Sequence, residues 1–130
     1  MSAVLPDQAT LAHQLAQLLA TDPGYAGLPW RSLAMVGEAA PGCLSMHGFL
    51  YLPDDRAVPA FPRNIQVFKQ LKALATLMQR RDGRYWNACV VGIERASGQA
   101  RFHFEYGDAG SWLITAQNAS QMAEWLRLVA

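Results

Sequence analysis

Apolar residues recur every three or four positions in three stretches of the chain, and this spacing predicts three amphipathic helices. The first stretch extends from Asp7 to about Ala20, with leucines at 11, 15, 18 and 19. The second follows Asn64, a residue type that caps helices, and its expected buried face is Ile65, Phe68, Leu71, Ala75 and Met78. The third begins at Asn118, and its expected apolar stripe is Met122, Trp125, Leu126 and Val129.

Short apolar stretches bounded by glycine and proline lie between these helices, a pattern typical of strands. Residues 30–39 and 43–52 are predicted to be an antiparallel pair joined around Pro41 and Gly42. Residues 53–62 contain three prolines, so we expect a loop there.

A second hairpin is the clearest local signal in the sequence. Residues 85–94 and 100–106 are apolar and aromatic, and the glycine-containing segment 95–99 separates them. Residues 112–115 are predicted to be a short extended piece before the last helix.

This order of elements predicts an α+β fold. Helix, two strands, helix, two or three strands and helix fit an antiparallel sheet of four to five strands with helices packed against it. The chain has 130 residues, a common size for one domain, so we expect a single domain over residues 1–130.

The strand at 100–106 brings several reactive side chains into a short segment. Because side chains alternate between faces, one face should carry Phe102, Phe104 and Tyr106. The other face should carry Arg101, His103 and Glu105. Alternation alone therefore explains why the polar residues gather, and no catalytic role is needed.

Charge is unevenly distributed along the chain. Six Lys and Arg residues between Arg63 and Arg84 face only Asp82, which predicts a local basic patch on the second helix. No basic segment precedes the first apolar stretch, and no run approaches the roughly 18 apolar residues of a membrane helix. We therefore expect a cytoplasmic protein that binds neither membrane nor nucleic acid.

Motifs for catalysis or metal binding are missing. The three histidines fall in different predicted elements, and Cys43 and Cys89 form no ligand pair, so no metal or cofactor is expected. Serine-hydrolase and phosphate-loop motifs are absent from the sequence. The enzyme alternative would need His103 and Glu105 to converge with Arg101 or His47.

The pattern of strands resembles the YezG-like immunity family, a family of small domains in the class of unknown function 600 that accompanies polymorphic toxins of bacteria. The resemblance rests on the opening helix, the strand beginning at Trp30 and, above all, the hairpin that begins near Trp86 and ends in Glu105, Tyr106 and Asp108. Gly107 departs from the family pattern, which often has an acidic residue there.

The resemblance implies a non-catalytic immunity protein that binds a cognate toxin as a monomer or weak dimer. The expected contact surface is an acidic rim with aromatic anchors, formed by Asp54, Asp55, Glu105, Tyr106, Asp108 and Trp112. A second candidate surface is the basic face of the middle helix, with Lys69, Lys72, Arg80 and Arg81. An adaptor or secretion-chaperone-like protein is the alternative function.

Overall fold

The computed structural model describes residues 7–38, 44–107 and 112–130 of the chain. The elements in chain order are α1 (Gln8–Ala20), β1 (Ser32–Glu38), β2 (Ser45–Tyr51), β3 (Ala57–Ala60), α2 (Ile65–Asp82), β4 (Ala88–Glu94), β5 (Ala100–Glu105) and α3 (Ala119–Leu126). The predicted α+β class is confirmed. No helix in the described part of the chain is both long and apolar enough to cross a bilayer.

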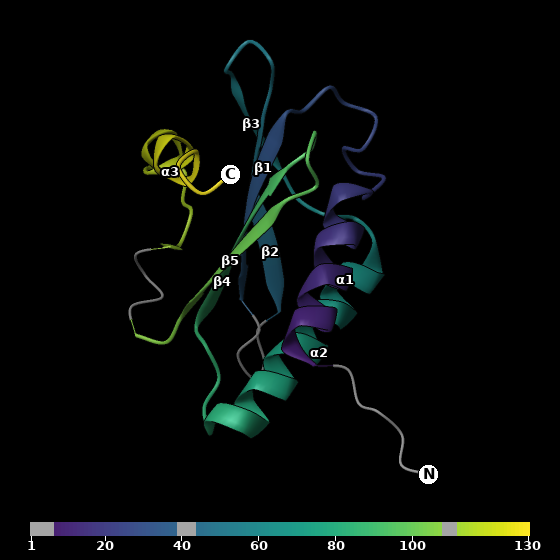
Figure 1. Ribbon diagram of the computed structural model, residues 1–130. Coiled ribbons are helices and arrows are strands. Elements are labelled where there is room, and N and C mark those ends of the chain that lie inside the picture. Colours follow the sequence, from purple (N-terminus) through teal and green to yellow (C-terminus); the bar gives the residue numbers. More distant parts are fainter. Residues whose placement is uncertain (1–6, 39–43, 108–111) are drawn as a thin grey trace.

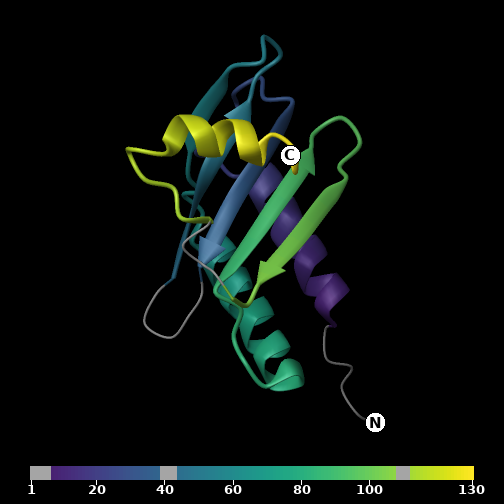
Figure 2. The same ribbon diagram turned by 90° about the vertical axis from the view of Figure 1, so that its left-hand side faces the viewer.

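The five strands form one antiparallel sheet in the order β3-β2-β1-β4-β5. Both predicted strand pairs are present, β1 with β2 and β4 with β5, and β1 joins them by pairing with β4. Helices α1 and α2 cover one face of the sheet, and α3 crosses the other face (Figures 1 and 2).

Alternation along the central strands supplies a hydrophobic core on each side of the sheet. On the α1–α2 side, Leu33 and Met35 of β1 pack with Val91 of β4 and with the helices. On the α3 side, Val36 of β1 and Val90 of β4 pack with α3. The central strands are therefore buried on both faces, which explains their nearly continuous apolar sequence.

One expectation about the loops is wrong. The segment predicted to be a loop contains β3, a four-residue strand that includes Pro59. An edge strand tolerates proline because one side of its backbone needs no ladder hydrogen bond. Residues 112–115 stay outside the sheet, so the fifth strand precedes α2 instead of following β5.

Helix α2 begins and ends as its capping residues predict. The Asn64 side chain accepts a hydrogen bond from the Gln66 amide, and Gly83 ends the helix in the left-handed conformation, with φ of 83°. The predicted buried face is wrong at Ile65, whose exposed fraction is 64%. The buried face follows Val67 and Leu74 instead, and Ile65 lies outside that stripe.

A buried carboxylate connects the end of α1 to the start of α2. Asp22 is fully buried and accepts hydrogen bonds from three backbone amides, those of Gly24 (2.8 Å), Arg63 (2.9 and 3.0 Å) and Asn64 (2.9 Å). The structure shows no ion pair between Asp22 and a cation in the described residues. Backbone donors alone therefore compensate the loss of solvent around this charge.

Helix α3 lies close to the sheet because of a glycine in β4. A Cβ on Gly92 would lie 1.6 Å from the carbonyl oxygen of Val129, so only glycine fits under the C-terminal segment. The Tyr51 hydroxyl donates a 2.6 Å hydrogen bond to the carbonyl of Ala123. These contacts position α3, and with it Trp125, on this face.

Candidate partner-binding surface

The carboxylate of Glu105, at the end of β5, accepts hydrogen bonds from Gly107 and Trp112. Its Oε1 accepts a 3.1 Å hydrogen bond from the Trp112 indole, and its Oε2 accepts one of 3.2 Å from the Gly107 amide. His103 Nε2 lies 3.7 Å from Oε1. The donors Trp112 and Gly107, and to a smaller extent His103, hold the pKa of Glu105 below its ordinary value.

The held indole of Trp112 is the base of an aromatic stack. Its ring lies parallel to that of Trp125 in α3, with centroids 4.7 Å apart and planes inclined by 4°. The His103 ring contacts Trp112 with a centroid distance of 5.3 Å. Trp125 keeps 45% of its surface exposed, as does Leu113, and Leu128 keeps 76%. We name the stacked pair of Trp112 and Trp125 the tryptophan patch.

Tyr106 lies away from the tryptophan patch, because alternation places it on the α1–α2 side. Its hydroxyl donates a 2.9 Å hydrogen bond to Asp82 Oδ2 at the end of α2, and the Arg84 guanidinium lies 4.5 Å from its ring centroid. Asp82 also pairs with Arg81 at 2.8 Å. Desolvation, and then the hydrogen bond to Asp82, raise the pKa of Tyr106. Tyr106 therefore connects β5 to α2.

The two aspartates of the expected rim lie at the other end of the sheet. Asp54 and Asp55 follow Tyr51, the last residue of β2, which pairs with Ser32 of β1. Ser32 in turn pairs with Glu94, where the turn into β5 begins. Glu105 instead pairs with Ala88 at the far end of β4. The structure therefore does not bring the predicted residues together into one surface, and Asp108 lies outside the described residues.

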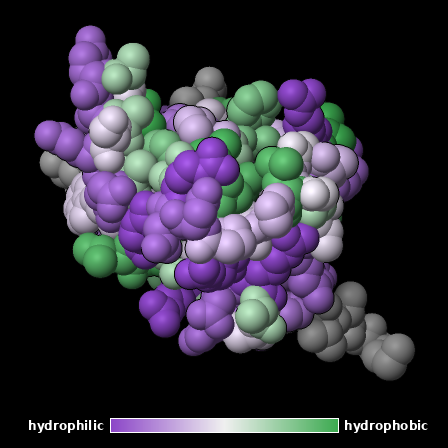
Figure 3. Space-filling model, turned by 90° about the horizontal axis from the view of Figure 1, so that it is seen from above, coloured by the Kyte–Doolittle hydropathy of each residue, from purple (hydrophilic) through white to green (hydrophobic). Residues whose placement is uncertain are grey.

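Nearby arginines engage both aspartates. Asp54 Oδ2 lies 2.6 Å from Arg56 Nε, and Asp55 Oδ1 lies 3.8 Å from Arg31. Hydrogen bonds from Arg56, first from its backbone amide, lower the pKa of Asp54. Viewed from above, this end of the molecule is mainly hydrophilic, with hydrophobic residues in small separate areas (Figure 3).

The basic face of α2 forms as predicted. Lys69, Lys72 and Arg80 are exposed, and the structure gives none of them an ion pair with a described acid. Arg81 differs, because it pairs with Asp82 and reaches Gln8 of α1. Exposed aromatic rings, which a nucleic-acid surface would use for stacking, do not accompany these cations on α2.

His47 does not converge with His103 and Glu105, as the enzyme alternative would need it to do. His103 pairs with Val90 in β4, Val90 with Val36 in β1, and Val36 with His47 in β2. Three strand spacings of about 4.8 Å put the two histidines roughly 14 Å apart. Within the described residues, no three His, Cys, Asp or Glu side chains gather as a metal site would require. Cys89 is fully buried, and desolvation raises its pKa.

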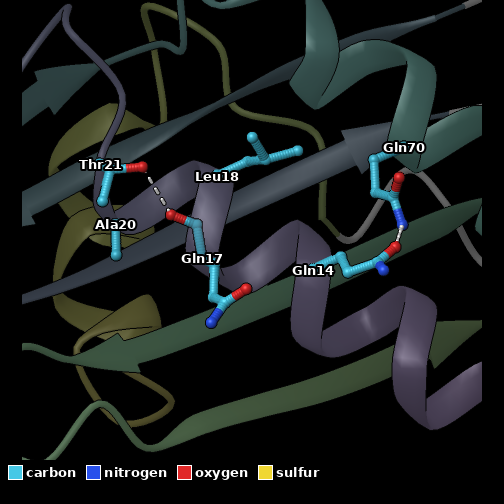
Figure 4. Close-up of a pocket in the computed structure, with 6 residues that line it drawn as sticks. All are labelled: Gln14, Gln17, Leu18, Ala20, Thr21 and Gln70. Carbon is cyan, nitrogen blue, oxygen red and sulfur yellow. Dashed lines mark hydrogen bonds between the residues drawn. The ribbon is translucent and has the colours of Figure 1, made fainter.

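A shallow groove of about 540 Å³ lies along α1, beside Gln70 of α2 (Figure 4). It is lined by Gln14, Gln17, Leu18, Ala20, Thr21 and Gln70. The Gln70 side chain donates to Gln14 Oε1 at 2.8 Å and to the Leu11 carbonyl at 3.2 Å. These lining residues carry no ionisable side chain, so the groove supplies no group for acid–base chemistry.

A second groove, of about 480 Å³, lies between α3 and the β2–β3 hairpin. Phe49, Ala57 and Ala123 contribute apolar surface to it, and charged residues, among them Arg56 and Glu124, also line it. Its length along β3 would suit a short extended segment with apolar side chains.

The sequence pattern did not identify Trp125 as a surface residue. Its helical spacing placed it in the buried stripe with Met122 and Leu126, and both of those are buried. Trp112 lies 13 positions earlier, beyond a loop, so no local spacing links the two indoles.

Comparison of the chain with models of protein families finds no match, and comparison with curated proteins also finds none.

Proposed function

We propose that this protein is a non-catalytic immunity protein of the bacterial cytoplasm, which binds a cognate toxin domain and blocks it through a protein–protein interface. The observation that carries the proposal is the tryptophan patch. Tryptophan is enriched among interface residues that contribute most to binding, because a rigid ring removes a large apolar area from water.

The way in which Trp125 is held supports this role. The indole of Trp112 supports one side of its ring, and the carboxylate of Glu105 fixes Trp112 in turn. Such an arrangement leaves little side-chain entropy to lose when a partner binds. The adjacent charges of Glu124 and Arg127 supply a polar rim, as in typical interfaces.

A neutralisation experiment tests the proposal. The chain is co-expressed with toxin domains encoded beside its gene, and cell growth and the affinity of the purified pair are measured. The native chain should restore growth, and Trp125→Ala should weaken binding about 30-fold or more. Ile65→Ala is the matched control, since it removes an exposed apolar side chain from α2.

The two possible failures have different meanings. If the native chain neutralises none of these toxin domains, the immunity function is wrong. If it does, and Trp125→Ala binds as well as Ile65→Ala, the function stands and the interface lies elsewhere. The basic face of α2 is then tested by Lys69→Glu with Lys72→Glu.

An adaptor that holds an extended segment of another protein is the second candidate. The groove between α3 and the β2–β3 hairpin favours it, because its apolar floor at Phe49 and Ala57 has charged neighbours. Ser120→Trp, which would project a large ring from an exposed lining residue into this groove, should abolish capture of such a segment. The same substitution should leave binding at the tryptophan patch in place.

A further inference from the structure

Strand β5 has an unpaired edge. The Glu94 amide donates to the Gln99 carbonyl, and this bond fixes which residues of β5 face β4. In an antiparallel ladder the backbone groups alternate, so Arg101, His103 and Glu105 face β4. The amides and carbonyls of Ala100, Phe102 and Phe104 consequently point outward. Among the described residues, no other strand pairs with this edge.

The two edges of the sheet differ in their ability to accept another strand. Strand β3 has four residues and includes Pro59, which has no amide to donate. Strand β5 has six residues and no proline. Its outward backbone groups are therefore the better template for an added strand.

The sequence of β5 is complementary to itself when it is read in the opposite direction. Residues 101–105 read Arg-Phe-His-Phe-Glu. If two copies pair antiparallel with His103 opposite its own copy, Arg101 lies opposite Glu105 and Phe102 opposite Phe104. In this register the outward amide and carbonyl of Phe102 form hydrogen bonds with those of Phe104 in the second copy. An antiparallel ladder requires this arrangement, because the outward groups must lie in the hydrogen-bonded pairs.

We propose that the protein forms a two-fold symmetric dimer by antiparallel pairing of two β5 strands, which joins two five-stranded sheets into one. This inference goes beyond the proposed function and involves no toxin. The Arg101 side chain is exposed, and the structure gives it no hydrogen bond or ion pair with another described side chain. Glu105 is held in place by Trp112 and Gly107, so it is positioned to accept the Arg101 of the second copy.

The side chains near the edge permit this approach. Gln14 faces α2, and the opposite flank of α1 carries alanines at positions 9, 12 and 16. A second copy would place its own α1 beside this small-residue flank, since a two-fold axis perpendicular to the sheet keeps both α1 helices on the same face. Phe102 and Phe104 are only partly buried, and the added strand would cover them.

A charge exchange tests the pairing. Analytical ultracentrifugation over concentrations from about 1 to 500 μM should show a dimer of the native chain. Arg101→Glu should raise the dissociation constant about tenfold or more, because two like-charged pairs replace two attractive ones. Glu105→Arg should do the same. An equimolar mixture of the two variants should form a heterodimer, in which every pair is again complementary.

A cysteine placed on the two-fold axis tests the register. In a Cys43→Ser background, His103→Cys should form an intermolecular disulfide on mild oxidation, because residues opposite each other in a pair without hydrogen bonds have Cα atoms about 4.5 Å apart. Arg101→Cys is the matched control. Its two copies would be offset by four residues, about 13 Å along the strand, and should not crosslink.

Phe102→Pro provides a test that leaves side-chain charge unchanged, since it removes an outward amide and should abolish the dimer. Ala57→Pro does the same on β3 and should leave the dimer intact; circular dichroism confirms that both variants fold. A native chain that stays monomeric at the highest concentration overturns the proposal. So does a dimer that survives Phe102→Pro, or one in which Arg101→Cys crosslinks as readily as His103→Cys.

Discussion

Replacing Asp22 with alanine is expected to remove the main connection between the end of α1 and the start of α2. The substitution leaves three backbone amides, those of Gly24, Arg63 and Asn64, without their acceptor. An unmade hydrogen bond to a buried donor costs roughly 1–3 kcal/mol. Because Gly24 and Arg63 are exposed and can recruit water, we take the lower part of that range and expect a loss of about 3–4 kcal/mol.

Urea unfolding followed by tryptophan fluorescence measures this loss, since Trp30 and Trp86 are buried and report on the core. With a slope of about 2 kcal/mol per molar urea, the unfolding midpoint should fall by roughly 1.5–2 M. Asp7→Ala is the matched control, because Asp7 caps α1 through one exposed bond from Thr10. It should cost about 1 kcal/mol, which lowers the midpoint by roughly 0.5 M.

The reasoning would be refuted if Asp22→Ala shifted the midpoint no further than Asp7→Ala. Asp22→Asn refines the test, because the amide keeps one acceptor oxygen and turns an N–H group toward the other donor. Its loss should lie between those of the two alanine variants. A slope unchanged across all three shows that the differences arise in the folded state.

Three further outcomes are expected. Gly92→Ala should displace the C-terminal segment, since its Cβ would collide with the Val129 carbonyl. The free energy of unfolding measured in urea should fall by about 2 kcal/mol. Deletion of the last two residues in the same variant should recover part of that loss. The pKa of Glu105 is lower in the folded chain, so its contact with Trp112 stabilises the fold at pH values above the ordinary pKa of 4.5. This stabilisation is lost as the pH falls through the folded pKa, and tryptophan fluorescence should change with it. In Glu105→Gln this acid-dependent change in fluorescence should be absent. Burial raises the pKa of Cys89, so peptide mapping by mass spectrometry should find this thiol unmodified by iodoacetamide until the chain unfolds.

Local patterns predicted the elements that depend on local physics. The hairpin of β4 and β5 follows from alternation and a glycine turn, and the caps of α2 follow from Asn64 and Gly83. Strand β3 was missed because four residues with a proline carry no strand signal, and only the neighbouring β2 makes them a strand. Ile65 was misplaced for a similar reason, because the packing of the whole helix decides which face is buried.

The candidate site was predicted less well, since a surface depends on where distant segments end. Glu105 and Trp112 meet at the exit of the strand. Asp54 and Asp55 belong to the opposite end of the sheet, which the sequence could not reveal before the strand order was known. Trp125 joins the surface through a stack formed only in three dimensions.

The way in which α3 is held has a consequence for the motions of the molecule. The helix has eight residues, and the Asn118 side chain makes no capping bond to it, so its stability comes from tertiary contacts such as the Tyr51 bond to Ala123. Amides of α3 should therefore exchange with deuterium through local opening, well before those of β1 and β4. A partner that covers Trp125 would slow exchange throughout α3, and this slowing would reveal the bound surface without any substitution.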